Sequence, residues 1–388
     1  MFPRVLLFLT LLVQAGCGTM KSVNQYFTGG VDNTEPPTPL TAFPQRLQVI
    51  EVWSRNVGKG TDEQYLKLAP AIYENHVYIA DSKGYLSALD AVTGKDVWRT
   101  DTDQPITGGP GTGDDLILFG TKEAEIFAYA AADGQFLWQA RVSSEVLAAP
   151  QAEDNFVVVR TIDGKLFGLN AETGARLWNY DRTVPALTLR GTSAPIIHDG
   201  LVITGFDGGK LAALELNSGR LLWETPISES SGRSELDRMV DIDSEPVILD
   251  GVIYVATFQG NIAAVELETG RMQWNRDISS YAGLGVDSKH VYVTDDESNV
   301  WALDRTSGAS VWKQELLKAR AVTAPTSIGN YVVVGDLEGY LHWMDSETGD
   351  FIARHQFTKD RIIAPPVASH DILYAYSSNG ALGAFTYQ

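Results

Sequence analysis

Short runs of apolar residues alternate with polar turns along nearly the whole chain, and the arrangement recurs at a regular interval. Each unit contains a turn that ends in glycine, and a tryptophan follows four residues later in all copies except the last, which has alanine instead. Such self-similarity indicates one small structural unit stacked many times. The copies are LDAVTGKDVW (residues 89–98), YAAADGQFLW (129–138), LNAETGARLW (169–178), LELNSGRLLW (214–223), VELETGRMQW (265–274), LDRTSGASVW (303–312) and MDSETGDFIA (344–353).

A second sequence marker shows that the unit has a constant length. It lies 28 positions before the end of each copy and is a proline except at Leu284. An apolar run, a polar turn such as residues 74–75, and two β-rich runs such as residues 77–79 and 85–89 separate the proline from the tryptophan strand. Three turns therefore separate four short strands, and no segment has a convincing helical period. Repeated four-stranded units of about 40 residues predict the blades of a β-propeller.

The two ends of the chain together predict one more blade. Residues 364–385 contain three further strand patterns, and the fourth strand is missing before Gln388. Residues 48–53 have a strand pattern that ends in a tryptophan and precedes the first complete unit. Joining these segments leaves no unpaired terminal blade. We therefore predict an all-β fold over residues 47–388, an eight-bladed β-propeller of four-stranded antiparallel blades in which the N-terminal strand closes the last blade.

The D-A-x-T-G-x-x-x-W style of repeat resembles that of the quinoprotein-like propellers. This family includes pyrroloquinoline quinone dehydrogenases and a lipoprotein of the outer-membrane β-barrel assembly (BAM) machinery. The resemblance covers nearly all of the chain after about residue 46. Propellers serve as enzymes, scaffolds and sensors alike, so the repeat predicts the fold and leaves the function to other features.

The start of the chain has the pattern of a lipoprotein signal peptide over residues 1–16. Its apolar run, residues 5–13, is too short to span a membrane, and small residues precede Cys17. Cys17 is the only cysteine, and its context resembles a bacterial lipobox, in which the new N-terminal cysteine is lipidated; Gln14 departs from the usual leucine. The alternative is an ordinary signal peptide with an incidental cysteine. By the same resemblance, Gly18 in place of aspartate favours a lipid anchor in the outer membrane, on its periplasmic face.

Charge and composition limit the partners. The formal net charge is −19, and removal of residues 1–16, which contain one arginine and no acidic residue, makes it −20. A nucleic acid would be repelled, so we expect no such partner. Residues 17–46 hold four prolines among polar residues and predict a lipidated N-terminus followed by a flexible tether.

We find little catalytic chemistry in the sequence. The glycine-rich residues 108–113 are followed by two aspartates and lack the Lys-Ser/Thr of a phosphate-binding loop. Asp237, Asp241, Asp243 and Glu245 are spaced closely enough to suggest a calcium loop, but the glycine and terminal glutamate of such a loop are absent. We expect a solvated acidic loop there, and no catalytic residue, cofactor or metal site. The resemblance keeps a periplasmic pyrroloquinoline-quinone-type dehydrogenase as an alternative, although those enzymes often have two adjacent linked cysteines and this chain has one cysteine.

The repeated tryptophans have a structural explanation. All occupy the same place on the fourth strand, where a large ring with an N–H can pack on the neighbouring blade and donate a hydrogen bond. We expect them to join successive blades.

Variation is confined to the connections between units. The two longest neighbouring connections are residues 179–194 and 224–245. In an up-and-down blade these connections emerge on the same face as the turns between second and third strands, so we expect the two loops side by side. Loops on a rigid scaffold often carry binding residues.

The contents of the two loops predict a protein-binding surface. The first loop places Leu187 and Leu189 beside Arg190, and the second contains Asp241 and Asp243. Apolar anchors next to an arginine and carboxylates are typical of a protein interface. The alternative for the leucines is that they turn inward and close the mouth of the central channel. By resemblance to the assembly lipoprotein, these five residues contact the periplasmic domains of BamA.

The resemblance therefore implies a non-enzymatic scaffold lipoprotein of the BAM complex. Its partners are the periplasmic domains of BamA and other BAM subunits, and its role is to assist insertion of β-barrel proteins into the outer membrane. A further alternative is a periplasmic peptide-binding propeller that captures unfolded outer-membrane chains through exposed strand edges.

Overall fold

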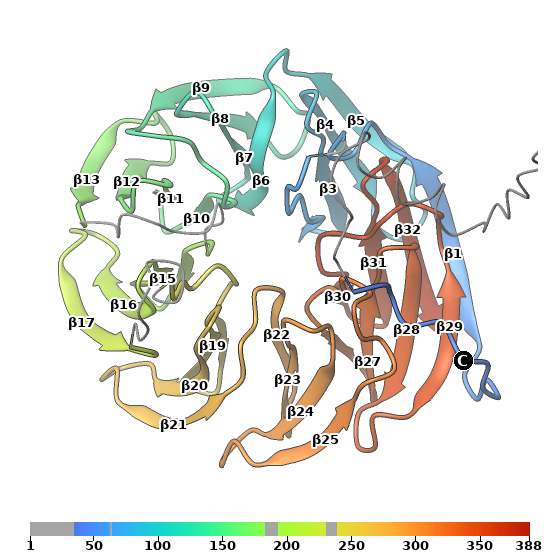
Figure 1. Ribbon diagram of the computed structural model, residues 1–388. Coiled ribbons are helices and arrows are strands. Elements are labelled where there is room, and N and C mark those ends of the chain that lie inside the picture. The colour runs from blue at the N-terminus through green and yellow to red at the C-terminus, as the bar shows by residue number, and fades with distance from the viewer. Residues whose placement is uncertain (1–34, 63, 183–192, 230–238) are drawn as a thin grey trace, which may run out of the picture. The chain divides into compact units, whose positions relative to one another are not determined.

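Eight sheets, each of four antiparallel strands, are arranged around a central opening (Figure 1). This computed structural model describes residues 35–62, 64–182, 193–229 and 239–388. The chain divides into two units, Met1–Pro36 and Pro37–Gln388, and all the described strands lie in the second. No helix occurs within the described ranges. The prediction of an all-β, eight-bladed propeller is confirmed.

Each of the first seven blades is a continuous stretch of chain. Blade 1 consists of β2 (Ala71–Tyr73), β3 (His76–Ala80), β4 (Tyr85–Asp90) and β5 (Asp96–Asp101), and blade 2 of β6 (Ile106–Gly113), β7 (Leu116–Thr121), β8 (Glu125–Ala130) and β9 (Phe136–Arg141). Blade 3 consists of β10 (Gln151–Glu153), β11 (Phe156–Arg160), β12 (Leu166–Asn170) and β13 (Arg176–Tyr180), and blade 4 of β14 (Ile196–His198), β15 (Leu201–Phe206), β16 (Lys210–Glu215) and β17 (Leu221–Pro226).

The second half of the ring repeats this order and then closes it. Blade 5 consists of β18 (Val247–Leu249), β19 (Val252–Ala256), β20 (Asn261–Glu266) and β21 (Met272–Asp277), and blade 6 of β22 (Gly283–Val286), β23 (His290–Thr294), β24 (Val300–Asp304) and β25 (Ser310–Gln314). Blade 7 consists of β26 (Thr326–Ile328), β27 (Tyr331–Gly335), β28 (Tyr340–Asp345) and β29 (Phe351–Gln356), and blade 8 of β30 (Val367–Ser369), β31 (Ile372–Tyr376), β32 (Ala381–Tyr387) and β1 (Val49–Asn56). In blade 8, β1 pairs with β32 from Val49↔Tyr387 to Asn56↔Ala381, which confirms that the N-terminal strand closes the last blade.

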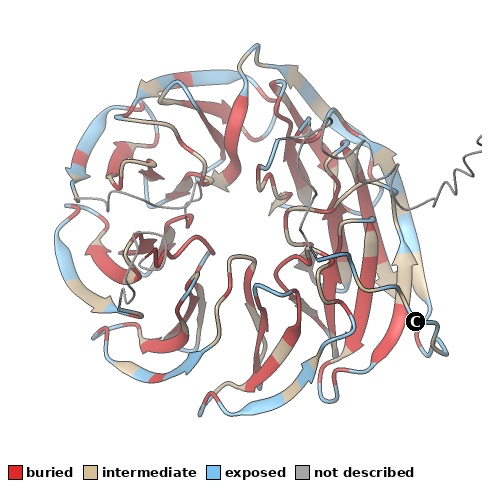
Figure 2. Ribbon diagram, viewed as in Figure 1, coloured by how far each residue is buried: buried red, intermediate tan, exposed pale blue. Residues whose placement is uncertain are grey.

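Burial follows the position of a strand within its blade (Figure 2). The second and third strands are buried almost throughout, as in β7, where every residue is buried. Both faces of these strands are covered by the adjacent blades, so their sequences are nearly continuous apolar runs. The outermost strands, such as β9, alternate between exposed and more buried residues because their outer edge meets solvent.

The glycine turn of each unit is specified locally. In blade 1, the carboxylate of Asp90 accepts hydrogen bonds from the backbone N–H and the hydroxyl of Thr93, at 2.7 and 2.6 Å. Gly94 has a φ of +66°, and a Cβ there would lie 2.4 Å from the ring of Trp53. Only glycine combines this left-handed conformation with so close an approach.

The ring of each motif tryptophan packs on the glycine turn of the following blade, and its Nε1 donates a hydrogen bond to a backbone carbonyl there. The expectation that these residues join the blades is confirmed. The donor and acceptor pairs are Trp53–Ala91 (3.1 Å), Trp98–Ala131 (2.8 Å), Trp138–Ala171 (2.7 Å), Trp178–Leu216 (2.7 Å), Trp223–Leu267 (3.0 Å), Trp274–Arg305 (3.0 Å) and Trp312–Ser346 (2.9 Å).

The exception, Ala353, has a topological explanation. The blade that follows it is blade 8, whose third and fourth strands are β32 and β1, from opposite ends of the chain. No turn joins these two strands, so there is no turn glycine for a ring at position 353 to cover. Ala353 is fully buried in a cluster with Trp343 and Phe385.

Within the described ranges, no helix is long and apolar enough to cross a membrane.

Candidate partner-binding face

One face of the ring carries the connections between blades. Neighbouring strands in a blade are antiparallel, so the second and fourth strands both end on this face, which we call the loop face. The turns between third and fourth strands, including the glycine turns, lie on the opposite face. Isolated bridges join Asp241 to Asp207 and to Phe258, which places the end of the second long loop against the turns of blades 4 and 5.

The residues predicted to contact a partner divide into two groups. Leu187, Leu189 and Arg190 lie in residues 183–192, outside the described part of the chain. Asp241 and Asp243 are described, with side chains only 1 % and 9 % exposed. The expectation of a solvated acidic loop is therefore wrong for these two aspartates, which are buried; Asp241 is bridged to the turns of blades 4 and 5.

Asp241 holds its loop against two blades. Its carboxylate accepts a hydrogen bond from the backbone N–H of Gly208 in blade 4 at 3.1 Å, and its carbonyl oxygen accepts one from the N–H of Phe258 in blade 5 at 2.9 Å. The next side chain, Ile242, is fully buried and fills the space left by the missing side chain of Gly205. This part of the loop is consequently anchored to the rigid ring.

Asp243 is buried without a hydrogen bond to either carboxylate oxygen from the described residues. Burial, with a smaller contribution from Asp241, raises the pKa of Asp243 to about 6, and the cations Lys67 and Arg160 oppose this rise. Near neutral pH the site therefore holds a buried carboxylate whose charge is only partly compensated.

Arg160, at the end of β11, connects the two long loops. Its guanidinium lies 3.2 Å from the carboxylate of Asp207, the bridge partner of Asp241, and donates a hydrogen bond of 3.4 Å to the carbonyl oxygen of Ser193. Ser193 lies one residue before the end of the first loop. The Arg160 side chain is fully buried, and burial lowers its pKa while Asp207 opposes that shift. Removing one partner of such a buried pair leaves an uncompensated charge.

The beginnings of the two loops are also joined. Arg182, two residues after β13, forms an ion pair with Glu224 on β17, and Lys210 lies 2.8 Å from the same carboxylate. The guanidiniums of Arg182 and Arg160 both lie over the ring of Phe206, 4.9 and 5.4 Å from its centroid. The described ends of both loops thus meet on one face, as the sequence predicts.

Comparison with known proteins identifies the family. The sequence model described as "Outer membrane protein assembly factor BamB" matches residues 51–314. The chain belongs to the BamB family. It is 49 % identical over 333 residues to the BamB of Alkalilimnicola ehrlichii, covering 86 % of this chain and 87 % of that protein. It is 48 % identical over 345 residues to the BamB of Kangiella koreensis, covering 89 % of each chain.

Solved structures agree with this membership. The crystal structure of BamB from Moraxella catarrhalis superimposes with a TM-score of 0.80 at 28 % identity, covering 87 % of this chain and all of that one. The chain is thus a BamB-family member by sequence, and by structure it is a propeller of the same design as that BamB.

A cavity of about 540 Å³ occupies the central channel of this BamB-family propeller. Its wall consists largely of small residues and prolines near the first strands, and its charged lining groups are Lys67, Asp243 and Glu245. The ammonium of Lys67 donates a hydrogen bond of 3.0 Å to the carbonyl oxygen of Tyr281. One cation and two carboxylates give this lining no excess of positive charge of its own with which to hold a polycarboxylate quinone. No group of three or more His, Cys, Asp or Glu among the described residues is placed to hold a metal ion.

Sequence reasoning missed Arg160, although a signal was present. Strand pairing aligns position 160 with uncharged and mostly small residues in the other blades, so a charged residue there stands out. The equivalent residues are Ala80, Gly120, Gly205, Ala256, Thr294, Gly335 and Tyr376. A large cation at a buried position requires a nearby anion. The sequence could have marked Arg160 in this way without naming Asp207 as its partner.

Proposed function

We propose that this protein is a non-enzymatic scaffold lipoprotein of the BAM complex. In this proposal Cys17 carries the lipid that anchors the chain on the periplasmic face of the outer membrane. The loop face binds the periplasmic domains of BamA, and the protein contacts other BAM subunits and assists insertion of β-barrel proteins. Membership of the BamB family supports this role, since its members are named as outer membrane protein assembly factors.

The observation that carries the proposal is the joining of the two long loops. Arg182 of the first loop pairs directly with Glu224 of the second, and Arg160 links Ser193 of the first loop to Asp207, the bridge partner of Asp241 in the second. These loops lie outside the constant repeat, so the fold does not constrain their length and composition, and they can carry binding residues. A preorganised loop pair binds with a smaller loss of conformational entropy than two independent loops.

In this proposal the five predicted residues have two different roles. Leu187, Leu189 and Arg190 supply the contact surface. Asp241 and Asp243 are buried, so they support the surface from below; Asp241 does so by accepting the hydrogen bond of Gly208.

The contact surface can be tested by changing Leu187 and Leu189 together to serine, and separately Arg190→Ala. Each variant should lose at least about thirtyfold in affinity for the periplasmic domains of BamA, because removal of an interface anchor typically costs 2 kcal/mol or more. Lys95→Ala, in a glycine turn on the opposite face, is the control and should bind normally. Affinity is measured by titration, and circular dichroism verifies the fold. Equal binding by all variants would remove the case for this face.

The supporting role of Asp241 predicts a different pattern. Asp241→Asn retains an oxygen that can accept the hydrogen bond from Gly208, whereas Asp241→Ala does not. We expect Asp241→Ala to weaken binding of BamA and Asp241→Asn to restore most of it. Equal loss in both variants would instead mean that the carboxylate charge of Asp241, and not its hydrogen bond to Gly208, is what supports the surface.

A second candidate function is the capture of extended, unfolded outer-membrane chains. It is supported by apolar side chains that are exposed on the outermost strands: Val97 (45 %), Phe136 (50 %), Leu137 (45 %), Leu177 (49 %), Leu222 (41 %) and Val311 (45 %). An outermost strand also has a free edge that can pair with an added strand. Phe136→Ser with Leu137→Ser should reduce binding of an unfolded β-barrel fragment in fluorescence anisotropy, and Val92→Ser, exposed in a turn, should not. Unchanged binding in the double variant would count against this candidate.

A further inference from the structure

Residues 37–47 lie along the outside of blade 7, although the sequence predicts a flexible tether up to residue 46, and we call them the strap. The N–H of Thr38 donates a hydrogen bond of 3.1 Å to the carbonyl oxygen of Lys318. Two guanidiniums of the blade hold strap carbonyls: Arg320 donates to Thr38 and Arg354 to Thr41, each at 3.0 Å. The strap is thus fastened through its backbone by cations of the ring.

Apolar contacts reinforce these hydrogen bonds. The rings of Phe43 and Phe351 are stacked with centroids 5.6 Å apart, and the guanidinium of Arg354 lies 5.0 Å from the centroid of Phe43. Leu40 packs on the core cluster between blades 6 and 7, and Leu47 is 7 % exposed in the cluster between blades 7 and 8. The strap therefore covers apolar surface as well as forming polar contacts.

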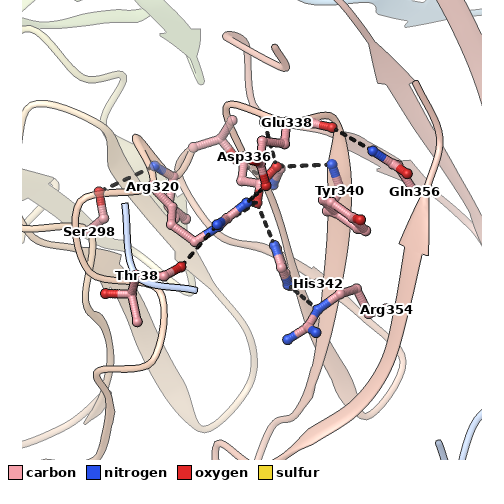
Figure 3. Close-up of polar contacts among 12 residues, drawn as sticks. Thr38, Ser298, Arg320, Asp336, Glu338, Tyr340, His342, Arg354 and Gln356 are labelled. Carbon is pink, nitrogen blue, oxygen red and sulfur yellow. Dashed lines mark hydrogen bonds and ion pairs between the residues drawn. The ribbon is translucent and has the colours of Figure 1, made fainter. Parts of the chain in front are cut away.

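The two guanidiniums are preorganised by a buried network (Figure 3). Arg320 lies 2.8 Å from the carboxylate of Asp336 and also pairs with Glu338. The same carboxylate lies 2.9 Å from Nε2 of His342, whose Nδ1 accepts a hydrogen bond of 3.1 Å from Nε of Arg354. Asp336 and His342 are fully buried, so the positions of both arginines are set by the ring before the strap binds.

The strap runs from the loop face to the opposite face. Thr38 lies beside Lys318 and Arg320, in the connection between β25 and β26, which is on the loop face. Arg46 lies 3.5 Å from Asp350, in the glycine turn between β28 and β29 on the opposite face. The strap thus crosses the height of blade 7, and the chain enters the propeller from the loop face.

We propose that the strap makes the tether leave from the loop face and so holds that face toward the lipid surface of the membrane. The inference rests on the lipid anchor at Cys17 included in the proposed function. Only the 20 residues 17–36 separate the strap from the lipid attachment. Without the strap, the tether would begin near residue 48, on the opposite face.

The shift of the exit point is large compared with the reach of the tether. A flexible chain of this length has an end-to-end distance of about 25 Å, and fully extended it reaches about 66 Å. The six residues of β29 span about 20 Å, and this is the distance by which the strap moves the exit point. The displacement is close to the mean reach of the tether, so the face from which it leaves biases the orientation of the propeller.

The test uses the full-length lipidated protein bound to phospholipid vesicles that carry an acceptor dye in the headgroup region. Single cysteines for the donor dye replace Lys122, in the loop-face turn of blade 2, or Ala132, in the opposite-face turn of the same blade. Both positions are exposed, and Cys17 is blocked by its lipid. We expect higher energy transfer from position 122 than from position 132.

Releasing the strap should abolish this difference. Leu40→Ser with Phe43→Ser weakens the strap without changing the ring, and Arg354→Ala removes one of its fasteners. Hydrogen exchange at residues 38–47 reports whether the strap has detached, and the difference in transfer between the two labels should be lost in each variant that has detached.

The outcomes separate the two proposals. Equal transfer from both labels in vesicle-bound wild type, or a difference that persists after detachment, would overturn the strap inference alone. Failure of the wild-type protein to float with vesicles would overturn the lipid anchor, and the inference with it.

Discussion

Nε1 of Trp178 donates a hydrogen bond of 2.7 Å to the carbonyl oxygen of Leu216, which lies 38 residues later in the next blade. The Trp178 ring is 7 % exposed and covers Gly219, where a Cβ would lie 2.5 Å from the ring. The same contact joins every pair of blades in which the following blade has a glycine turn, so the ring of blades is held by one repeated interaction.

We expect Trp178→Ala to lower the free energy of unfolding by about 3 to 5 kcal/mol, because it creates a cavity between blades 3 and 4 and leaves the Leu216 carbonyl without this donor. Leu177→Ala, at a neighbouring side chain that is 49 % exposed, should change it by less than about 0.5 kcal/mol. Chemical denaturation of both variants provides the comparison. An unchanged midpoint for Trp178→Ala would contradict the role assigned to the tryptophans.

Placing the tryptophan of the repeat at position 353 should destabilise the protein. Ala353 is fully buried against Trp343 and Phe385, and blade 8 has no glycine turn to receive a ring. Ala353→Trp should therefore overpack the core and destabilise the protein by about 1 to 3 kcal/mol. A higher melting temperature in this variant would refute the topological explanation of the exception.

Asp243 should reduce stability at neutral pH. Its pKa is raised by burial to about 6 in the folded protein, above the unfolded value of about 3.8. The folded state therefore favours the protonated acid, and stability is lost as the pH rises from about 4 to about 6. We expect the free energy of unfolding of Asp243→Asn to exceed that of wild type by up to about 2 to 3 kcal/mol at pH 7 and to match it near pH 4. Denaturant titrations at the two pH values measure this difference.

The matched control for Asp243 is Asp277→Asn, at an exposed aspartate in β21, which should change the free energy of unfolding at pH 7 by less than about 0.5 kcal/mol. If Asp243→Asn is equally destabilised at both pH values, the carboxylate has a partner that compensates its charge.

Protonation of His342 should reduce the stability of the folded protein in mild acid. Burial lowers the pKa of His342 and Asp336 opposes this, while Arg354 and Arg320 add to the lowering. A folded pKa below the unfolded value of about 6.5 means that stability is present above pH 6.5 and is lost as the pH falls through the folded pKa. Protonation would place an N–H on Nδ1, which faces the N–H of Arg354.

His342→Gln provides the comparison, because the Gln amide can donate to Asp336 and accept from Arg354 without titrating. Unfolding free energies measured from pH 7.5 to 5 should fall more steeply in wild type than in this variant. Parallel profiles would mean that the histidine titrates as freely as in the unfolded chain.

The lipid anchor can be tested by Cys17→Ser, which should leave the propeller folded and release it from membranes. Each buried methylene of an acyl chain contributes about 0.8 kcal/mol, so two or more chains provide stable anchoring that a serine cannot replace. Fractionation followed by circular dichroism of the released protein measures both effects. A processed serine variant that still sediments with outer membranes in high salt would exclude this anchor.

The sequence by itself determined the number of blades, the four strands in each, the position of the glycine turns and the closure by β1. These features depend on local patterns: alternation, turn residues and a repeat of constant length. It also indicated, from the up-and-down strand order, that the two longest neighbouring connections, residues 179–194 and 224–245, share a face. Local rules suffice because each blade contacts mainly its neighbours.

The tertiary structure decided what the site residues do. Burial of Asp241 and Asp243, and the pairing of Arg160 with Asp207, depend on groups that are distant in sequence and meet only after the blades are packed. Exposure of a charged residue cannot be deduced from its own sequence neighbours when its cover comes from other blades. Ring closure brings the two ends of the chain together. It explains why Ala353 faces a blade without a glycine turn, and why the strap crosses blade 7.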